Sequence, residues 1–449
     1  MRKRESFASS IGVIAAAAGS AVGLGNIWRF PYITGQGGGA AFIIVYLLFI
    51  IFIGMSCLLT EFLIGRKARS DAIGSFLKLA PGKPWVIGGW IVIITVILIF
   101  SFYVVIFGWT LDYLVKSVMN AFAGKSSTEI GQIFTTTTSA IYTPIIYTFI
   151  GLGLTAVIVL KGIVNGIEKC SKILMPFLFI LLLILLVRAL TLPGAREGVL
   201  FLLKPDFSKL TGEVVLTALG QAFFTLSLGA GTMITYGSYI KKKEKLGSAI
   251  VQICCLNCSI SLLAGFVIFP AAFTFGISPG EGPGLAFVTL PNIFQHMGGG
   301  YFFSIIFFLL MAVAALTTTI SMLEPIVTSV REQIRLTRKQ ATFISIIIVA
   351  ILSIPCSLSF GIMSGVKIGG NTFFDICNNL TANYGMPIGS LIFAVFVGWF
   401  LGRAKVRDEL SNKGLLPVRY FPYYLFVIRF VVPVAIIIIF LSGIGIIKL

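Results

Sequence analysis

The 449-residue sequence contains few charged residues and a single histidine, His296. Charged residues make up 11% of the chain and hydrophobic residues 57%, a balance that excludes an ordinary water-soluble domain. The sequence contains no HExxH motif, no Ser–His arrangement and no paired aspartates at mid-membrane depth. The composition therefore gives no support for an intramembrane hydrolase or any other enzyme.

The seven cysteines form no pattern typical of an extracellular disulfide framework, and we expect no disulfide. Cys254 and Cys258 lie four residues apart on one predicted helix face. Because no third ligand is in sight, we interpret them as helix-packing residues rather than as a metal pair.

Long apolar runs are abundant instead, and mean hydropathy is +1.02. Eleven runs are long enough to cross a bilayer as helices, which predicts an all-α polytopic membrane protein with one transmembrane domain over 1–449. The expected spans are centred near residues 20, 52, 100, 150, 180, 225, 260, 315, 350, 390 and 435.

The basic residues predict the orientation of the chain in the cell membrane. With a cytoplasmic N-terminus, 24 of the 34 Lys and Arg residues fall on the cytoplasmic side. Eleven spans then place the C-terminus outside the cell. The net charge of +18 is thus a topology signal, aided by contact with the lipid bilayer, and not a nucleic-acid-binding surface.

Two runs carry glycines and polar residues at mid-membrane depth. The first contains Gly19-Ser20-Ala21-Val22-Gly23-Leu24-Gly25-Asn26, and the sixth contains the segment from Gln221 to Gly231. A helix can break at this depth only where protein or a water-filled cavity satisfies the freed backbone groups. Breaks five spans apart are typical of transporters built from inverted repeats, with the binding site between the breaks.

The polar groups near the breaks are mostly neutral oxygens, which suit a monovalent cation such as Na⁺ better than a divalent one. Half-helix N-termini suit a carboxylate and loose carbonyls suit an ammonium, so an α-amino acid fits such a site. The side chains concerned are Asn26, Thr225, Asn257, Thr317 and Thr318.

Several of these motifs resemble those of the neurotransmitter:sodium symporter family, in particular its bacterial branch, which transports amino acids such as leucine and tyrosine. The motifs are Ser20-Ala21-Val22-Gly23-Leu24-Gly25-Asn26-Ile27-Trp28-Arg29-Phe30-Pro31, the segment from Gln221 to Gly231, Leu316-Thr317-Thr318, and Arg335-Leu336-Thr337-Arg338-Lys339. The resemblance implies a 5+5 inverted repeat in which helices 1 and 6 are broken. Repeat one would cover about 7–190, repeat two about 212–402, and an extra helix about 418–447.

The resemblance also implies two sodium sites and a substrate site between them. The sodium ligands would be Gly19, Ala21, Val22, Asn26, Thr225, Asn257, Ala314, Thr317 and Thr318. The substrate-binding residues would be Ser20, Ala21, Leu24, Gly25, Ile99, Tyr103, Phe224, Thr225, Ser227, Ala230, Thr318 and Met322. The outer gate would be Arg29 with Asp375, and the inner gate Arg4 with Glu332, near Phe7 and Tyr239.

Three departures from the family pattern bear on function. The usual twelfth span is missing, position 230 is Ala where the leucine transporter has Phe, and position 261 is Ser where some bacterial members carry a carboxylate. A serine cannot balance the charge of two sodium ions, so chloride is a candidate unless Glu61 supplies the charge. The residues that match the chloride position of animal members are Tyr46, Gln221, Thr225, Asn257 and Ser261.

The sequence therefore predicts a sodium-coupled symporter that imports hydrophobic or aromatic L-amino acids by alternating access. A second hypothesis is a membrane sensor that binds an amino acid without transporting it. The two predicted gates favour transport, since a sensor needs no second opening.

Overall fold

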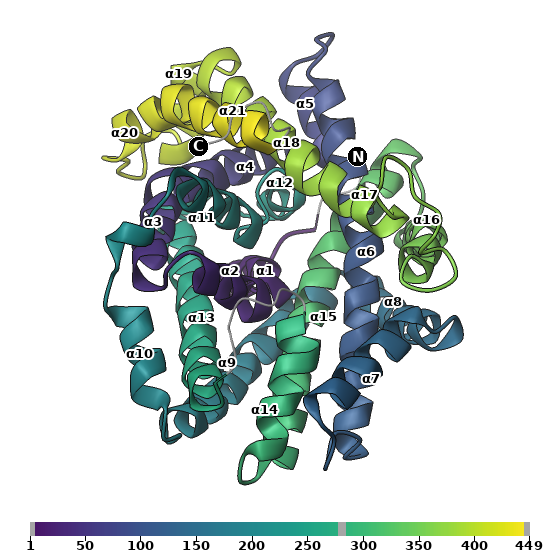
Figure 1. Cartoon of the computed structure of the whole chain (residues 1–449). Coiled ribbons are helices and arrows are strands. Elements are labelled where there is room, and N and C mark those ends of the chain that lie inside the picture. Colours follow the sequence, from purple (N-terminus) through teal and green to yellow (C-terminus); the bar gives the residue numbers. More distant parts are fainter. Residues whose placement is uncertain (1–4, 277–283, 444–449) are drawn as a thin grey trace.

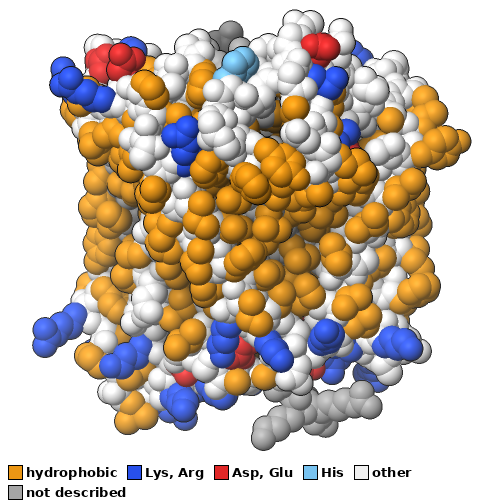
Figure 2. Space-filling view, turned by 90° about the horizontal axis from the view of Figure 1, so that it is seen from below, with side chains coloured by type: hydrophobic (Ala, Val, Ile, Leu, Met, Phe, Trp, Pro, Cys, Tyr) orange, Lys and Arg blue, Asp and Glu red, His pale blue; other side chains and the backbone are white. Residues whose placement is uncertain are grey.

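A computed structural model describes residues 5–276 and 284–443 (Figure 1). All named elements in these ranges are helices, which confirms the predicted all-α class. Figure 2 shows a broad apolar band between two rims, with Lys and Arg side chains gathered most densely along one of them. An apolar band bounded by charged rims is the surface expected of a protein that sits in a bilayer.

The first part of the chain folds into helices that form its membrane crossings and the short connections between them. They are α1 (Ser10–Ala21), α2 (Phe30–Gln36), α3 (Ala40–Phe49), α4 (Met55–Ala68), α5 (Ala72–Leu79), α6 (Val86–Val118), α7 (Ser127–Ser139), α8 (Tyr142–Leu160), α9 (Lys169–Leu190) and α10 (Ala195–Leu203). Wide helical turns extend some of these helices, among them η1 (Gly25–Arg29) before α2 and η3 (Ile163–Glu168) before α9.

The second part of the chain follows the same plan. Its helices are α11 (Gly212–Thr225), α12 (Thr232–Ser238), α13 (Leu246–Thr274), α14 (Leu290–His296), α15 (Gly300–Gln333), α16 (Arg338–Leu358), α17 (Phe373–Asn379), α18 (Met386–Val395), α19 (Arg403–Ser411), α20 (Phe421–Phe426) and α21 (Val432–Gly443).

The first crossing is broken where the sequence predicts a break. The α1 helix ends at Ala21, and the backbone of Val22 is extended, with φ −87° and ψ 95°. The helical segment that begins at Gly25 is turned by 55° from α1. The extended residue and the change of direction interrupt the helical hydrogen bonds at the glycines that predicted the break.

The sixth crossing is broken over residues 226–231, between α11 and α12. Ser227 has φ +53°, a left-handed conformation that is uncommon outside glycine, and Gly229 has φ +79°. A Cβ at Gly229 would lie 2.0 Å from the carbonyl oxygen of Met386, so no side chain fits there. The Gly229 N–H donates to Glu61 Oε1 at 2.7 Å, which gives this buried carboxylate the protein partner that its depth demands.

The predicted count of eleven spans is not confirmed. Within the described residues, nine helices are long and apolar enough to cross a membrane, and the bent first crossing makes ten. The two helices of the sixth crossing, α11 and α12, are not among these ten, since α12 has only seven residues and six non-helical residues separate it from α11.

The two breaks lie inside the bundle. Figure 1 shows α1 and α2 near the centre, and α1 packs against α9, α13 and α15. The residues of α1 from Ala16 to Ala21 are all buried. The non-helical backbone is therefore shielded from lipid, as membrane-embedded polar groups require.

Candidate functional site

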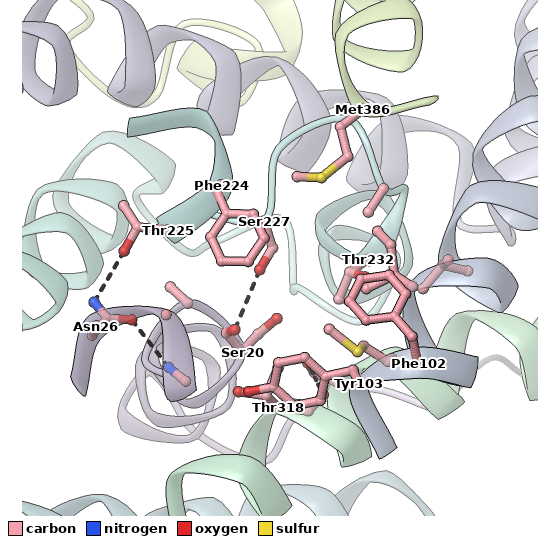
Figure 3. A pocket seen from close by; sticks show the side chains of 18 residues that line it. Ser20, Asn26, Phe102, Tyr103, Phe224, Thr225, Ser227, Thr232, Thr318 and Met386 are labelled. Atoms are coloured by element: carbon pink, nitrogen blue, oxygen red, sulfur yellow. Dashed lines mark hydrogen bonds between the residues drawn. The ribbon is translucent and has the colours of Figure 1, made fainter. Parts of the chain in front are cut away.

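A pocket of about 40 Å³ lies between the two breaks (Figure 3). Its walls come from helices α1, η1, α6, α11, α12, α15 and α18 and from both breaks. Its lining residues are Ser20, Ala21, Gly23, Gly25, Asn26, Val96, Ile99, Phe102, Tyr103, Phe224, Thr225, Ser227, Ala230, Thr232, Thr318, Ser321, Met322 and Met386. Every residue that the sequence assigns to substrate binding is on this wall except Leu24.

Leu24 reaches the site through its backbone rather than its side chain. The side chain is 1% exposed and packs in the core, while the backbone N–H donates to the Tyr103 hydroxyl at 3.0 Å. That bond leaves the tyrosine proton free to be donated. The family resemblance implied that Leu24 contacts the substrate. The direction of its side chain could not be read from the sequence, because Leu24 lies inside the break.

Five lining residues were missed by the sequence analysis as substrate contacts or site residues. Val96, Phe102 and Met386 are apolar residues on apolar helices, and Thr232 and Ser321 are small polar residues. Only a structure separates such residues from those that face lipid or a neighbouring helix.

The polar corner of the pocket forms around the bare backbone of Gly23. A Cβ built at Gly23 would lie 2.5 Å from Thr318 Oγ1 and 2.8 Å from the Tyr103 hydroxyl. The two hydroxyls thus face a residue without a side chain, as Figure 3 illustrates for Tyr103 and Thr318. Such a corner offers hydroxyl donors to a carboxylate without offering a competing anion.

A second polar group lies across the pocket. The Ser227 hydroxyl donates to the Ser20 carbonyl at 3.3 Å, which links the two breaks directly (Figure 3). The Ser20 hydroxyl is buried and has no hydrogen-bond partner among the described residues. A buried hydroxyl normally has a hydrogen-bond partner, so we expect a polar atom of a ligand to bind the Ser20 hydroxyl.

The first predicted sodium site is a cluster of neutral oxygens around Asn26. Asn26 Nδ2 lies 3.0 Å from Thr225 Oγ1, 2.8 Å from Asn257 Oδ1 and 2.7 Å from Ser261 Oγ. The Asn257 carbonyl oxygen is a fourth neighbour at 3.4 Å, yet an amide carries only two hydrogens. The oxygens of Thr225, Asn257 and Ser261 are neutral and of the kind that a small monovalent cation binds. Asn26 faces them through its amide nitrogen, and its Oδ1 accepts from the Gly23 N–H at 3.1 Å.

The residues predicted for the second sodium site also come together. Thr317 Oγ1 and Thr318 Oγ1 lie 2.9 Å and 3.1 Å from the Ala314 carbonyl oxygen. Thr318 Oγ1 is also 3.5 Å from the carbonyl oxygen of Val22, at the end of α1. A Cβ at Gly19 would touch Thr317, so the α1 backbone lies directly against this pair of hydroxyls. These neutral oxygens form a second set suited to a monovalent cation.

The candidate chloride residues adjoin the Asn26 cluster. The Tyr46 hydroxyl lies 3.4 Å from Asn257 Nδ2. Asn26 Nδ2 is within hydrogen-bond distance of both Asn257 Oδ1 and Ser261 Oγ. Both polar atoms of the Gln221 amide are buried without a partner in the described part of the chain. Glu61 is engaged elsewhere, at Gly229. These hydroxyl and amide groups can donate hydrogen bonds to an anion, and among the described residues none of them bonds a carboxylate.

The outer-gate residues do not form an ion pair in the described structure. The guanidinium carbon of Arg29 lies 4.1 Å from the ring centroid of Phe224. Asp375 instead caps the start of α17, where it accepts hydrogen bonds from the Thr372 N–H and hydroxyl at 3.1 and 2.7 Å. The predicted pair of Arg29 with Asp375 is therefore not formed in the described structure.

At the inner side, Arg4 lies outside the described residues, so the predicted pair with Glu332 cannot be placed. Glu332 accepts hydrogen bonds from the Ser70 hydroxyl and the Asp71 N–H, at 2.8 and 3.0 Å. Phe7 is buried against the rings of Tyr236 and Tyr239, as its predicted position near the inner gate requires.

A cavity of about 1160 Å³ opens on this inner side, lined by Glu5, Tyr239, Glu332 and neighbouring residues. Burial and the neighbouring carboxylate of Glu332 raise the pKa of Asp71, which lies on its wall between the second and third crossings. The segment before α1 thus contributes Glu5 to the wall of this wide cavity.

Comparison with known proteins places this site in a family. The profile of the Sodium:neurotransmitter symporter family matches residues 4–139 and 129–448. The uncharacterized sodium-dependent transporter YhdH of Bacillus subtilis is 41% identical over 100% of this chain and 99% of its own length. The sodium-dependent serotonin transporter of Drosophila melanogaster is 28% identical over 92% of this chain and 72% of its own length.

A solved structure agrees with the arrangement of the helices. The crystal structure of MhsT in complex with L-phenylalanine is similar with a TM-score of 0.90 and 44% identity, over 98% of this chain and 100% of that one. The resemblance seen in the sequence is thereby confirmed. The chain belongs to the sodium:neurotransmitter symporter family, a family of sodium-dependent, multi-pass membrane transporters and not of enzymes.

Proposed function

We propose that the protein imports hydrophobic or aromatic L-amino acids together with Na⁺ by alternating access. The observation that carries this proposal is the pocket between the two breaks, which joins a hydroxyl-lined corner to an apolar remainder. The similarity to MhsT, which was crystallised with L-phenylalanine, supports the same substrate class.

The pocket has no charged lining side chain. A ligand must therefore bring both its own carboxylate, for the Tyr103 and Gly23 corner, and its own ammonium, for the carbonyls of the breaks. A charged substrate side chain would lie unpaired among apolar groups, at a cost of several kcal/mol. Zwitterions with apolar side chains satisfy each of these conditions.

The pocket is small, since its 40 Å³ holds only about three water molecules. Met322 and Met386 line it with unbranched thioether chains that have many rotamers. We infer that these methionines and the Phe224 ring move when a large side chain enters. Ala230 provides the fixed part of the space.

We further propose that two sodium ions enter with each substrate at the Asn26 and Thr317 clusters, and that a chloride ion adjoins the first. The N-terminus would face the cytoplasm and the C-terminus the outside. The repeats would cover about 7–190 and about 212–402, with about 418–447 as the extra helix.

Uptake into proteoliposomes tests the proposal. Radiolabelled L-phenylalanine, L-leucine or L-tyrosine should accumulate when external Na⁺ exceeds internal Na⁺, and accumulation should vanish when choline replaces Na⁺. Saturable sodium-dependent binding without accumulation would instead favour the sensor. If neither binding nor uptake occurs for any of the twenty amino acids, the proposed substrate class is wrong.

A further inference from the structure

A buried aspartate meets a glutamate of a distant helix on the wall of the large inner-side cavity. Asp71 directly precedes α5 and is 0% exposed, and Glu332 is in the last turn of α15. Glu332 Oε2 accepts a hydrogen bond from the Asp71 N–H at 3.0 Å and another from the Ser70 hydroxyl at 2.8 Å. The two carboxyl groups therefore lie next to each other, and both line the cavity.

Every group that donates a hydrogen bond to the Asp71 carboxyl is neutral. Helix α5 supplies the N–H groups of Ile73 at 3.2 Å and Gly74 at 3.1 Å. Helix α15 supplies the Ser329 hydroxyl at 2.9 Å and the Gln333 amide at 3.2 and 3.3 Å. No Lys or Arg of the described residues pairs with Asp71. A fully buried carboxylate without a cation, beside a second carboxylate, is unfavourable.

Other charged and titratable residues surround this pair on the cavity wall. They are Glu5, Arg69, Lys78, Tyr239, Arg331, Arg335 and Arg338. Arg69 donates to the Ser6 hydroxyl at 2.8 Å, and Lys78 donates to the Arg69 carbonyl at 3.4 Å. Helix α6, which also packs against α5, carries no Lys, Arg, Asp or Glu before Asp112.

Two of the arginines on this wall are paired with other carboxylates. Arg331 Nη1 lies 3.5 Å from Glu5 Oε1, and Arg338 Nη2 lies 2.5 Å from Glu324 Oε2. These cations contribute positive charge to the cavity, but none of them is bonded to Asp71. Arg4, the implied gate partner of Glu332, lies outside the described residues.

A proton between the two carboxyl groups removes the conflict at Asp71. One carboxyl then donates an O–H hydrogen bond that the other accepts, whereas two carboxylates would repel each other. Burial first, and then the charge of Glu332 and the contact with its carboxyl, raise the pKa of Asp71 to about 7. The hydrogen bonds from Ser329 and Gly74 favour the carboxylate but are outweighed. Because the pKa is raised, the proton is held below about pH 7 and lost as the pH rises through this value.

We propose that Asp71 and Glu332 form a proton-binding site that opens to the inner-side cavity and holds one shared proton near neutral pH. The pH of the solution in the cavity sets whether the pair carries one negative charge or two. The bound proton joins α5 to the end of α15, and its loss leaves two repelling anions between these helices. The site shares no residue with the central pocket, so the proposal rests on neither the substrate nor sodium.

An infrared titration of the purified full chain in lipid nanodiscs, without substrate, tests the site. A protonated carboxyl group is detected by its carboxylic-acid C=O stretching band, which disappears when the proton leaves. In the parent, this band should include one carboxyl that titrates with a midpoint near pH 7. Asp71→Asn should lose the amplitude of one carboxyl from this step. The variant should fold, because asparagine is as good an N-cap for α5 as aspartate.

Glu332→Gln tests whether the proton is shared. The substitution removes the negative charge that favours protonation but leaves Asp71 in its buried position. The midpoint should therefore fall by at least about one pH unit, which is a tenfold loss of proton affinity.

Two carboxyl variants away from the cavity serve as controls. Asp112→Asn replaces a buried carboxyl that pairs with Lys116. Glu129→Gln replaces an exposed carboxyl that forms the capping box of α7. Both should retain the amplitude and the midpoint of the parent near pH 7.

The site is overturned if no carboxyl of the parent titrates near pH 7, or if Asp71→Asn titrates there with the amplitude of the parent. An unchanged midpoint in Glu332→Gln would overturn the sharing of the proton. If Asp71→Asn does not yield folded protein, the shift in Glu332→Gln decides the question. Since the titration uses neither substrate nor a sodium gradient, its failure is distinguishable from failure of the proposed function.

Discussion

The Arg29 guanidinium stacks on the ring of Phe224, with 4.1 Å between the guanidinium carbon and the ring centroid. The two residues come from the two broken crossings, and Phe224 lines the central pocket. A desolvated contact of this kind is worth about 2 kcal/mol. Arg29 thus covers the aromatic wall of the pocket while its predicted partner Asp375 remains engaged at Thr372.

We expect Arg29→Ala to slow uptake by at least about tenfold and to weaken equilibrium binding much less. The reason is that the variant loses both the ring contact and the charge needed to shut the outer path, whereas the substrate contacts remain. Uptake rates and scintillation-proximity binding on the same preparation measure the two effects separately.

The control for this experiment is Arg429→Ala. Arg429 also lies over an aromatic ring, that of Trp399 at 5.6 Å, but it is remote from the pocket. Its replacement should leave uptake near the parent rate. Equal uptake by Arg29→Ala and the parent would remove Arg29 from the gate.

Sodium dependence should be concentrated at Asn26. Replacing Asn26 by Ala removes the amide around which the oxygens of Thr225, Asn257 and Ser261 gather. The loss of a buried polar partner costs about 1–3 kcal/mol, so the apparent affinity for Na⁺ should fall by roughly 5-fold or more. A sodium titration of substrate binding measures this shift.

Ser329→Ala serves as the control, because that buried serine bonds Asp71 at the inner side and not the sodium clusters. Its sodium titration should overlay that of the parent. Binding by Asn26→Ala that stays unchanged in Na⁺, or parent binding that persists in choline, would contradict the first sodium site.

The sequence predicted the two breaks because glycines and polar residues cluster at mid-membrane depth in two spans that are five apart. Gly23 and Gly229 lie where the structure needs bare backbone. It could not predict that Met386 lines the pocket, since α18 presents apolar side chains to lipid and pocket alike. Nor could spacing predict the ring contact of Arg29, because this depends on which of several states the chain adopts.

The chloride hypothesis gives a prediction at Ser261. A carboxylate placed there would supply a fixed negative charge beside the Asn26 cluster, so Ser261→Glu should transport without chloride. The parent should lose most of its uptake when gluconate replaces chloride. Uptake in the two anions, compared for parent and variant, measures the effect. Indifference of the parent to gluconate, with no change in Ser261→Glu, would reject a chloride site.

Selectivity for the substrate side chain should be set largely by Ala230. This residue is 3% exposed and lines the pocket opposite the hydroxyls of the Gly23 corner. One buried methylene is worth about 0.8 kcal/mol, so the flexible thioethers of Met322 and Met386 should admit many apolar side chains with similar affinities. We expect Trp, Tyr, Phe, Leu and Met to compete ahead of Gly, Asp and Lys.

Ala230→Phe should shift this preference toward small side chains. A phenyl ring at position 230 would fill much of a pocket of only about 40 Å³. Binding of the substrate tryptophan should therefore weaken by at least about 1–3 kcal/mol relative to binding of alanine, or roughly 5- to 150-fold in affinity. Competition of unlabelled amino acids against radiolabelled leucine measures the ranking.

Tyramine is the matched probe for the carboxylate, since it keeps the tyrosine ring and lacks the acid. It should compete poorly in both proteins. The corner formed by Tyr103, Thr318 and Gly23 contains no carboxylate that could replace the acid that tyramine lacks, so the sodium site would stay incomplete. Tyramine competing as well as tyrosine, or an unchanged ranking of Trp over Ala in Ala230→Phe, would show that the substrate lies elsewhere in the protein.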